Sequence, residues 1–203
     1  MISQPSSSLL ARALAVEPAD AIGERILDAA LEQFGRTGIT RSTMEDVARR
    51  AGTARVTVYR RFPTKQTLVE AVLLRECLRC LLTLDDAIAG LPALDDRIVE
   101  GFRVALGYAR AHPLVGGLLE VEPQTILPFL TLHAGPATAA IREYLAGHLR
   151  AADGGSGSDT DVVAELMVRI AVSFVTAPEG CVPLRTDEEI RGFARRYLVP
   201  LAG

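Results

Sequence analysis

The sequence contains no tryptophan, and aromatic residues make up only 5% of its 203 residues, whereas 49% are hydrophobic. A core built from this composition has to be aliphatic. Such a composition favours helices, because alanine, leucine, arginine and glutamate are strong helix formers. No strand pattern with hairpin signals and no internal repeat is present. We therefore expect an all-α chain.

Long apolar runs and secretion signals are also missing. No run of eighteen apolar residues is present, so we expect no membrane span. The first twenty residues, MISQPSSSLLARALAVEPAD, lack the basic start of a secretory signal, and their apolar part is interrupted by Arg12. We predict a flexible N-terminal tail over residues 1–19 and a cytoplasmic protein whose three cysteines stay reduced.

Signals for catalysis, metals and cofactors are thin. Cys77 and Cys80 form a single C-x-x-C within a predicted helix, and no second ligand pair follows at zinc-site spacing. We favour burial of this pair as small apolar side chains, with redox sensing as the alternative. The stretch GGSGSD lacks the lysine and the preceding strand of a phosphate loop. We find no catalytic constellation and predict no cofactor and no metal.

Basic charge is concentrated near one end of the chain. Residues 20–65 include nine basic and six acidic side chains, a net charge of +3, although the whole chain carries −3. Lys65, the only lysine, closes this segment. This asymmetry is expected where one part of a protein meets a polyanion and the rest does not. A solvated helix face is the alternative.

Helix signals divide this basic segment. The stretch GERILDAALEQFGRTG predicts an amphipathic helix that ends at Gly35 and Gly38. In TRSTMEDVARRAG, Ser42 and Glu45 have the spacing of a capping box, and Gly52 stops the second helix. The inner face of the first helix is formed by Ile22, Ile26, Ala30 and Phe34.

A third short helix, ARVTVYRRF, follows directly. Thr53 is its expected cap, Pro63 stops it, and Thr64 is the expected cap of a long helix that starts at Lys65. Two short helices joined at a glycine predict a helix-turn-helix.

The third helix has two different faces. Val58 and Phe62 lie four residues apart and are expected to point inward. The opposite face holds Arg55, Val56, Tyr59 and Arg60, flanked by Thr57 and Arg61. Arginine forks, hydroxyl groups and a small apolar side chain are what recognition of base edges and phosphates in a major groove requires.

The stretch ILDAALEQFGRTGITRSTMEDVARRAGTARVTVYRRFPTKQTL resembles the DNA-binding domain of the TetR family of bacterial transcriptional regulators. The resemblance rests on A…F…G…T, T…VARRAG and TVYRRFPTK, and covers about the first third of the chain. Two departures stand out. Thr53-Ala54 occupies the place of the family's frequent Val-Ser, and Val56 that of a glycine or alanine. The resemblance implies a helix-turn-helix domain over 20–66 and a helical effector-binding and dimerisation domain over 67–203.

The resemblance also implies contacts with double-stranded operator DNA. Side chains expected to face base edges, some with backbone contacts, are Arg55, Val56, Thr57 and Arg60. Side chains expected to contact phosphates are Thr43, Tyr59, Arg61 and Lys65. For Tyr59 a place at the core edge is the alternative, and for Arg60 and Arg61 a solvated pair.

In the TetR family the last two helices form a homodimer. Two apolar stripes in this chain fit that role, and four such helices would form a bundle. Packing of the stripes on their own core is the alternative. The stripes consist of Val163, Leu166, Ile170 and Phe174, and of Ile190, Phe193 and Tyr197.

An effector pocket is harder to place. The proline-interrupted stretch EPQTILPFLTLHAGP is the most irregular part of the chain, and we expect it to border a cavity. Because few polar side chains are available, the expected effector is a small hydrophobic molecule. Surface or core positions stay open for the polar candidates. The candidates are Phe102, Tyr108, His112, Leu118, Phe129, Leu130 and His133.

These features predict a ligand-responsive repressor. It would bind a pseudo-palindromic operator as a homodimer and be released by a small apolar effector. A transcriptional activator of the same fold is one alternative, and a helical small-molecule carrier or enzyme is another. The basic face of the third helix argues against the last, because a carrier has no use for it.

Overall fold

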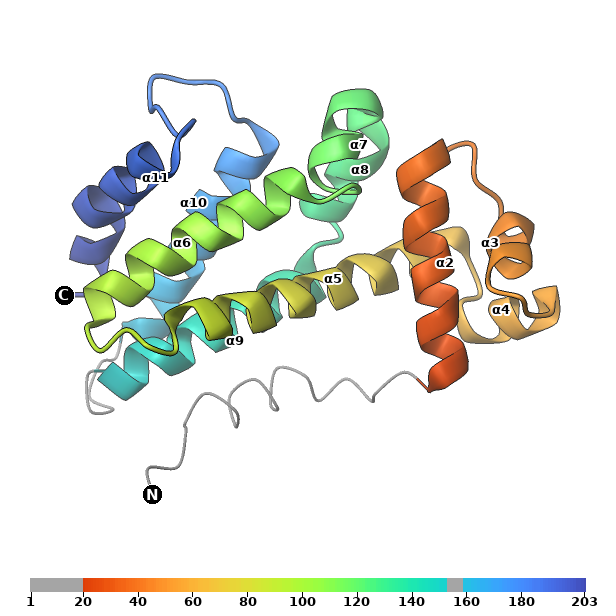
Figure 1. The fold of residues 1–203 in the computed structure, drawn as a ribbon, viewed down its shortest axis with the longest axis horizontal. Coiled ribbons are helices and arrows are strands. Elements are labelled where there is room, and N and C mark those ends of the chain that lie inside the picture. Colours follow the sequence, from red (N-terminus) through yellow and green to blue (C-terminus); the bar gives the residue numbers. More distant parts are fainter. Residues whose placement is uncertain (1–19, 153–158) are drawn as a thin grey trace. The chain divides into compact units, whose positions relative to one another are not determined.

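The computed structural model describes residues 20–152 and 159–203, and every regular element in these ranges is helical, as expected (Figure 1). The predicted tail over 1–19 lies outside the described residues. None of the helices in the described ranges is long and apolar enough to cross a bilayer.

The described residues form two compact units. The N-terminal unit contains residues 20–77 and 111–137, and the C-terminal unit contains residues 78–110, 138–152 and 159–203. Helix α5 (Lys65–Ile88) passes from the first unit to the second. The segment 111–137 thus groups with the N-terminal helices, while the functional boundary expected at residue 66 stays a prediction.

Each unit has its own helices. The N-terminal unit holds α2 (Ala21–Thr37), α3 (Met44–Arg50), α4 (Arg55–Arg61), α7 (Gly116–Val121) and α8 (Pro123–Leu130). The C-terminal unit holds most of α6 (Leu94–Ala111) and of α9 (Gly135–Ala152), together with α10 (Thr160–Thr176) and α11 (Asp187–Phe193). After α11 the chain continues as a π-helix (Ala194–Leu198) and a 3-10 turn (Val199–Leu201).

Helix α2 begins and ends with local signals, not all of them those expected. Its N-cap Asp20 accepts a hydrogen bond from the Gly23 amide at 2.8 Å. The helix ends at Gly38, whose φ of 83° suits glycine. The expected end at Gly35 is wrong: a Cβ there would lie 3.3 Å from Cβ of Pro113, so this glycine permits close packing instead. Ile22 is 40% exposed and lies outside the core.

The capping box of α3 lies one residue later than expected. Thr43, not Ser42, is the N-cap, and its hydroxyl accepts from the Asp46 amide at 3.1 Å. The Asp46 carboxylate accepts from the Thr43 amide and hydroxyl, at 3.1 and 2.6 Å. Ser42 instead donates its buried hydroxyl to the Gly38 carbonyl at 2.6 Å. The expected partner Glu45 is therefore free of the box.

Of the next two helices, α4 lacks a side-chain cap and α5 has one. The N-cap of α4 is Ala54, which makes no side-chain cap, so the expected cap at Thr53 is wrong. The expected cap at Thr64 is confirmed, because its hydroxyl accepts from the Thr67 amide at 3.1 Å. The Thr64 amide in turn donates to the Thr67 hydroxyl at the same distance.

Helices α7 and α8 complete the core of the N-terminal unit. Pro123 occupies the first turn of α8 and Pro128 lies inside it, so the stretch expected to be irregular is largely helical. Leu114, Leu118 and Ile126 are buried in one cluster with residues from α2 to α5. That cluster also contains Ile26, Phe34, Val47, Val58, Leu68 and Val72. The helix-turn-helix therefore rests on a segment that follows it by about fifty residues.

A buried polar chain joins three parts of this unit. The Nε of Arg75 donates to Oε1 of Glu76 at 3.0 Å, and Nη1 pairs with Asp28 of α2 at 2.8 Å. Nε2 of His112 lies 3.3 Å from Oε2 of Glu76. The Leu114 amide donates to His112 Nδ1 at 3.2 Å, so the ring proton belongs on Nε2 and is donated to Glu76. These bonds fasten α5 to α2 and to the turn before α7.

Candidate DNA-binding interface and cavity

The outward face of α4 has the composition expected from the sequence. Val58 is fully buried and Phe62 packs against the core, as expected. Arg55 and Arg60 are exposed, and Val56 is 73% exposed. A valine this exposed gains no free energy from burial in the free protein.

Arg55 is held in place by two neighbours. Its Nε pairs with Oε1 of Glu45 on α3 at 2.7 Å, and its guanidinium lies 5.1 Å from the centre of the Tyr59 ring. Sequence reasoning missed Glu45 because it had been assigned to the capping box. Cation–π and ionic contacts at exposed sites are each weak, but together they orient the planar fork. Tyr59 is half-buried and packs on the core edge.

The remaining α4 candidates divide into exposed and engaged side chains. Thr57 is half-buried. Arg60 has no hydrogen-bond or ion-pair partner in the described parts of the chain. Arg61 pairs with the N-cap Asp20 of α2 at 2.5 Å. The Gly23 amide, and then Arg61, hold the pKa of the Asp20 carboxyl below its ordinary value. Arg61 thus fastens α4 to the start of α2, which leaves Arg60 as the more available cation.

Lys65 holds the loop between α2 and α3. Its ammonium donates to the carbonyls of Ile39, Thr40 and Ser42 at 2.9, 3.3 and 3.1 Å. An ammonium has three donors, so these bonds use them all. The structure therefore gives Lys65 a positioning role in the free protein, and the phosphate contact that the family resemblance implied stays a prediction.

A carboxylate fixes the same loop from α8. Oε2 of Glu122 accepts from the Thr40 amide at 3.2 Å and from the Thr40 hydroxyl at 3.1 Å. Together with Lys65, this contact fixes the loop that leads into Thr43 at the start of α3. The hydroxyl of Thr43 is occupied by its capping box, so a phosphate there would meet mainly the backbone amides.

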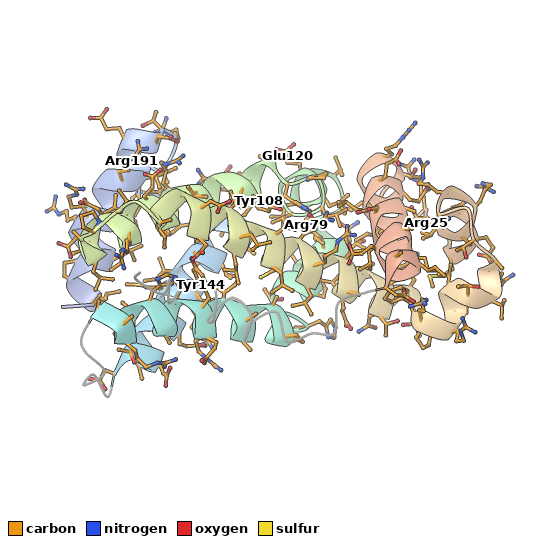
Figure 2. All side chains as sticks on the ribbon, turned by 60° about the horizontal axis from the view of Figure 1, so that its bottom comes forward. Arg25, Arg79, Tyr108, Glu120, Tyr144 and Arg191 are labelled. Carbon is orange, nitrogen blue, oxygen red and sulfur yellow. The ribbon has the colours of Figure 1, made fainter. Side chains whose placement is uncertain are left out.

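The turn between α3 and α4 is also held. Gly52 has a φ of 59°, the left-handed conformation that glycine adopts without strain. Arg25, labelled in Figure 2, extends from α2, and its Nη2 donates to the Ala51 carbonyl at 2.6 Å and to the Gly52 carbonyl at 3.3 Å. The two short helices are thus braced by α2 at their junction.

The C-terminal unit contains an apolar cavity of about 100 Å³. Side chains of α5, α6, α9, α10 and the π-helix line it. Its lining includes Ile88, Phe102, Ala105, Ile141, Leu145, Met167 and Leu198. Gly101 on α6 also faces it, because a Cβ there would meet Leu84 and Ile88, both lining residues, at 3.9 Å.

Polar groups gather at one part of this lining. The Tyr144 hydroxyl, on α9 (Figure 2), donates to Oδ1 of Asp85 at 3.3 Å. Nε2 of His148 lies 3.6 Å from the same oxygen and is buried without a hydrogen bond. Burial lowers the pKa of His148 below its ordinary 6.5, against the opposing effect of Asp85. Arg97 donates its Nε to the Leu91 carbonyl at 2.6 Å.

Most of the pocket residues expected from the sequence lie elsewhere. Of the seven, only Phe102 lines this cavity. Leu118 is buried in the core of the N-terminal unit, with Phe129 and Leu130 packed against that core. His112 belongs to the buried polar chain. The other two do not line the cavity either: Tyr108 is half-buried and His133 is exposed.

The expected dimer stripes are mostly turned toward their own core. Ile190 is buried, and the rings of Phe174 and Phe193 meet edge to face with 5.1 Å between their centres. Val163 and Ile170 pack against the same cluster. Only Leu166 and Tyr197 of the seven are exposed. Further exposed apolar side chains on these elements are Val162 and Leu201.

Cys77 and Cys80 belong to no metal-binding group among the residues that the structure describes. No group of three or more histidine, cysteine or acidic side chains that could hold a metal is present within 20–152 and 159–203. Burial raises the pKa of the Cys80 thiol to about 12, which disfavours a reactive thiolate. Cys77 donates weakly to the Ala137 carbonyl at 3.8 Å.

Two family models match the chain. The model described as bacterial regulatory proteins, tetR family, matches residues 26–72, and the model described as bacterial tetracyclin repressor, C-terminal domain, matches residues 94–196. The HTH-type transcriptional regulator AlkX of Mycobacterium tuberculosis is 26% identical over 185 residues, which are 88% of this chain and 84% of that protein. SrpR of Pseudomonas putida is 42% identical over 64 residues, 32% of this chain and 30% of that protein.

Solved structures share the fold. The TetR family repressor AlkX from Dietzia sp. strain DQ12-45-1b, implicated in biodegradation of n-alkanes, superposes with a TM-score of 0.69 at 24% identity, over 87% of this chain and 93% of that chain. RolR without ligand superposes with a TM-score of 0.66 at 13% identity, over 88% and 94%. Because the second family model alone matches just over half of the chain, the protein belongs to the TetR family of transcriptional regulators, with a DNA-binding helix-turn-helix near its N-terminus.

Proposed function

We propose that this regulator is a repressor that binds a pseudo-palindromic operator as a homodimer and is released by a small hydrophobic effector. The observation that carries the proposal is the outward face of α4. Arg55 is held by Glu45 and Tyr59, Val56 is exposed, and Arg60 has no partner in the described residues. This set of side chains fits base edges and phosphates of a major groove.

Within this proposal the contacts with DNA divide into two kinds. Arg55 and Val56 read base edges, with Thr57 beside them, and Arg60 contacts a base or the backbone. Tyr59 and the amides at the start of α3, near Thr43, contact phosphates. Lys65 and Arg61 position the helices, since their cationic groups already bind within the protein.

The dimer is supported by exposed apolar side chains at the C-terminal end. Leu166 on α10 is 43% exposed, and Tyr197 in the π-helix is 53% exposed. Val162 and Leu201 are exposed as well. Apolar groups left on a surface are covered favourably by a second copy. A homodimer would place two recognition helices about 34 Å apart, one turn of DNA.

The effector site of the proposal is the cavity of the C-terminal unit. Its lining is almost wholly apolar, and the helices that form it include α5, whose first half belongs to the N-terminal unit. A ligand can lower operator affinity only if it binds the DNA-free state more tightly than the DNA-bound state. Tenfold release needs about 1.4 kcal/mol of that difference.

Selection from a random pool of double-stranded DNA tests the proposal, followed by titration of the selected sequence. The expected result is one enriched sequence with two inverted half-sites, bound by two chains. Arg55→Ala should weaken binding to that sequence and flatten the preference at one position in each half-site. Arg142→Gln on α9 removes the same charge far along the chain and should leave both unchanged. A protein that enriches no sequence would refute operator recognition by this face.

A further inference from the structure

The side chains that line the cavity of the C-terminal unit indicate which chemical class of ligand it can bind. It is lined by apolar side chains except near Arg97, Tyr144 and His148. We infer that the cavity binds a short aliphatic carboxylate, with the chain among the apolar side chains and the carboxylate on Arg97 and His148. This inference rests on the effector site proposed above.

The size of the cavity favours a slim ligand. Its volume is about 100 Å³. Pockets for drug-sized molecules measure about 300–1,000 Å³, and an apolar cavity of about 150 Å³ is enough for benzene. A cavity of about 100 Å³ is smaller than this, so any ligand has to displace lining side chains, and a slim unbranched chain displaces fewer of them than a ring system does. The lining from Ile88, Phe102 and Met167 offers such a chain no polar partner.

Arg97 is the cation available to a carboxylate. Only its Nε is engaged, by the Leu91 carbonyl, and it has no ion pair with any carboxylate of the described residues. Its two terminal nitrogens keep their donors. A guanidinium fork binds a carboxylate through two parallel hydrogen bonds, which are stronger than neutral ones. An unpaired arginine beside an apolar cavity is therefore better matched by an acid than by an alcohol.

His148 offers a second site for the head group. Its Nε2 is buried and makes no hydrogen bond in the described structure, and Oδ1 of Asp85 at 3.6 Å is too distant. Asp85 is the neighbour of this nitrogen but lies beyond hydrogen-bond distance, so the nitrogen is poorly satisfied, and in the tautomer with the proton on Nε2 it would donate to a ligand oxygen. Tyr144 cannot serve in this way, because its hydroxyl already donates to Asp85.

Asp85 limits the head group as well. Its carboxylate lies beside His148 and repels a second anion, so the carboxylate of the ligand has to lie on the Arg97 side of the imidazole. This requirement makes binding depend on Arg97 more than on the other polar groups. Dependence on Arg97 also distinguishes carboxylate binding from nonspecific uptake of an apolar molecule by the cavity.

Calorimetric titration of the full chain with hexanoate and with 1-hexanol tests the inference, because the two differ only in the head group. Hexanoate is expected to bind at least tenfold more tightly than 1-hexanol. Arg97→Gln should remove that preference by weakening hexanoate binding tenfold or more, with a change below twofold for 1-hexanol. Arg142→Gln, on α9 and outside the cavity lining, is the matched control and should retain the preference.

A second variant tests whether the aliphatic chain of the ligand lies in this cavity. Gly101→Leu adds a side chain whose Cβ has ordinary contacts and whose tip enters the cavity. It should abolish binding of both compounds and leave the unfolding midpoint at or above that of the wild type. Binding that survives in Gly101→Leu would overturn the location.

The outcome also separates this inference from the proposed function. Equal affinity for hexanoate and 1-hexanol, unchanged in Arg97→Gln, would overturn the carboxylate and leave an apolar effector site. Binding of neither compound would overturn the ligand class and its cavity. Operator binding, measured separately on the same samples, tells whether the DNA-binding function stands.

Discussion

Glu45 on α3 and Arg55 at the first residue of α4 form an ion pair of 2.7 Å across the helix-turn-helix. Both side chains are largely exposed, so the pair adds little stability. The pair instead orients the Arg55 side chain, because the guanidinium contacts Glu45 on one side and the Tyr59 ring on the other. The side chain that we expect to read a base is thus pre-positioned before DNA arrives.

Removal of the Glu45 charge should therefore lower the preference of the protein for operator DNA over unrelated DNA. In Glu45→Gln, Arg55 loses its partner and one negative charge near the phosphates disappears. Affinity for unrelated DNA should rise, while the ratio of operator to unrelated binding falls severalfold. Competition titrations at fixed salt measure both. Glu188→Gln, an exposed acid in the first turn of α11, is the control that should change neither.

Arg55 itself should matter more. Arg55→Ala is expected to weaken operator binding by about 1–3 kcal/mol and to relax the base preference at its position. Anisotropy titrations with the operator and with single-base variants measure both effects. An unchanged ranking of the single-base variants would show that Arg55 reads no base.

Lys65 and Arg60 should differ in the salt dependence of DNA binding. Each phosphate contact that is lost lowers the slope of log affinity against log salt by about one unit. Arg60→Ala should produce such a decrease if Arg60 contacts the backbone. Lys65→Met should leave the slope unchanged and lower the free energy of unfolding, because three carbonyls lose a charged donor. A slope that is lower in Lys65→Met than in the wild type would show that Lys65 contacts a phosphate.

The helix-turn-helix was accessible from sequence because its signals are local. Gly52 with a positive φ, Pro63 after α4 and the buried Val58 all act within a few residues. The capping box was misplaced by one residue because both Ser42 and Thr43 carry hydroxyls at a plausible spacing. The choice depends on the turn after α2, where Ser42 donates its hydroxyl to the Gly38 carbonyl four residues earlier, which leaves Thr43 as the cap.

The cavity of the C-terminal unit was not predicted from the sequence, for a different reason. Apolar periodicity reports that Leu118, Phe129 and Leu130 face a core, but not which core. In the structure they pack with the N-terminal helices. The lining that the chain does provide comes from α5, α6, α9, α10 and the π-helix, whose convergence no local signal encodes. The internal partners of Lys65 and Arg61 were not predicted from the sequence either, because they are distant along the chain.

The buried polar chain should control the stability of the N-terminal unit. Arg75→Met removes the guanidinium that pairs with the buried Glu76 carboxylate, and removal of one partner of a buried pair costs about 3–5 kcal/mol. The double variant Arg75→Met/Glu76→Leu should recover part of this loss, because the buried carboxylate is removed together with the cation, although His112 loses its acceptor. Urea unfolding of the single and double variants checks the expectation. A double variant less stable than the single one would contradict it.

The capping box of α3 should give an acid-side pH dependence. Hydrogen bonds from the Thr43 hydroxyl and amide lower the pKa of the Asp46 carboxyl from 3.8. A lowered folded-state pKa contributes stability that is present above 3.8 and is lost as pH falls through the lower folded value. Asp46→Asn should therefore be less stable than the wild type at neutral pH, and the difference should shrink below about pH 4. Thermal unfolding across pH 3–7 measures it.

The exposed apolar side chain of Leu166 allows a test of the proposed homodimer. Leu166→Asp places a charge on an exposed apolar site of α10, so it should prevent dimer formation without unfolding the chain. Val121→Asp, on the exposed part of α7, is the matched control and should stay dimeric. Sedimentation velocity checks both variants. Phe174 is a poorer test, because it packs on Phe193 within the same chain and its loss would also disturb folding.

Operator recognition by the exposed face of α4 is the central claim, and selection from a random DNA pool tests it most directly. The expected result is an enriched sequence with two inverted half-sites whose centres lie about 34 Å, or a multiple of it, apart along the DNA. The same selection with Arg55→Ala should lose one conserved position in each half-site. An identical enriched sequence from wild type and Arg55→Ala, or no enrichment from the wild type, would contradict the claim.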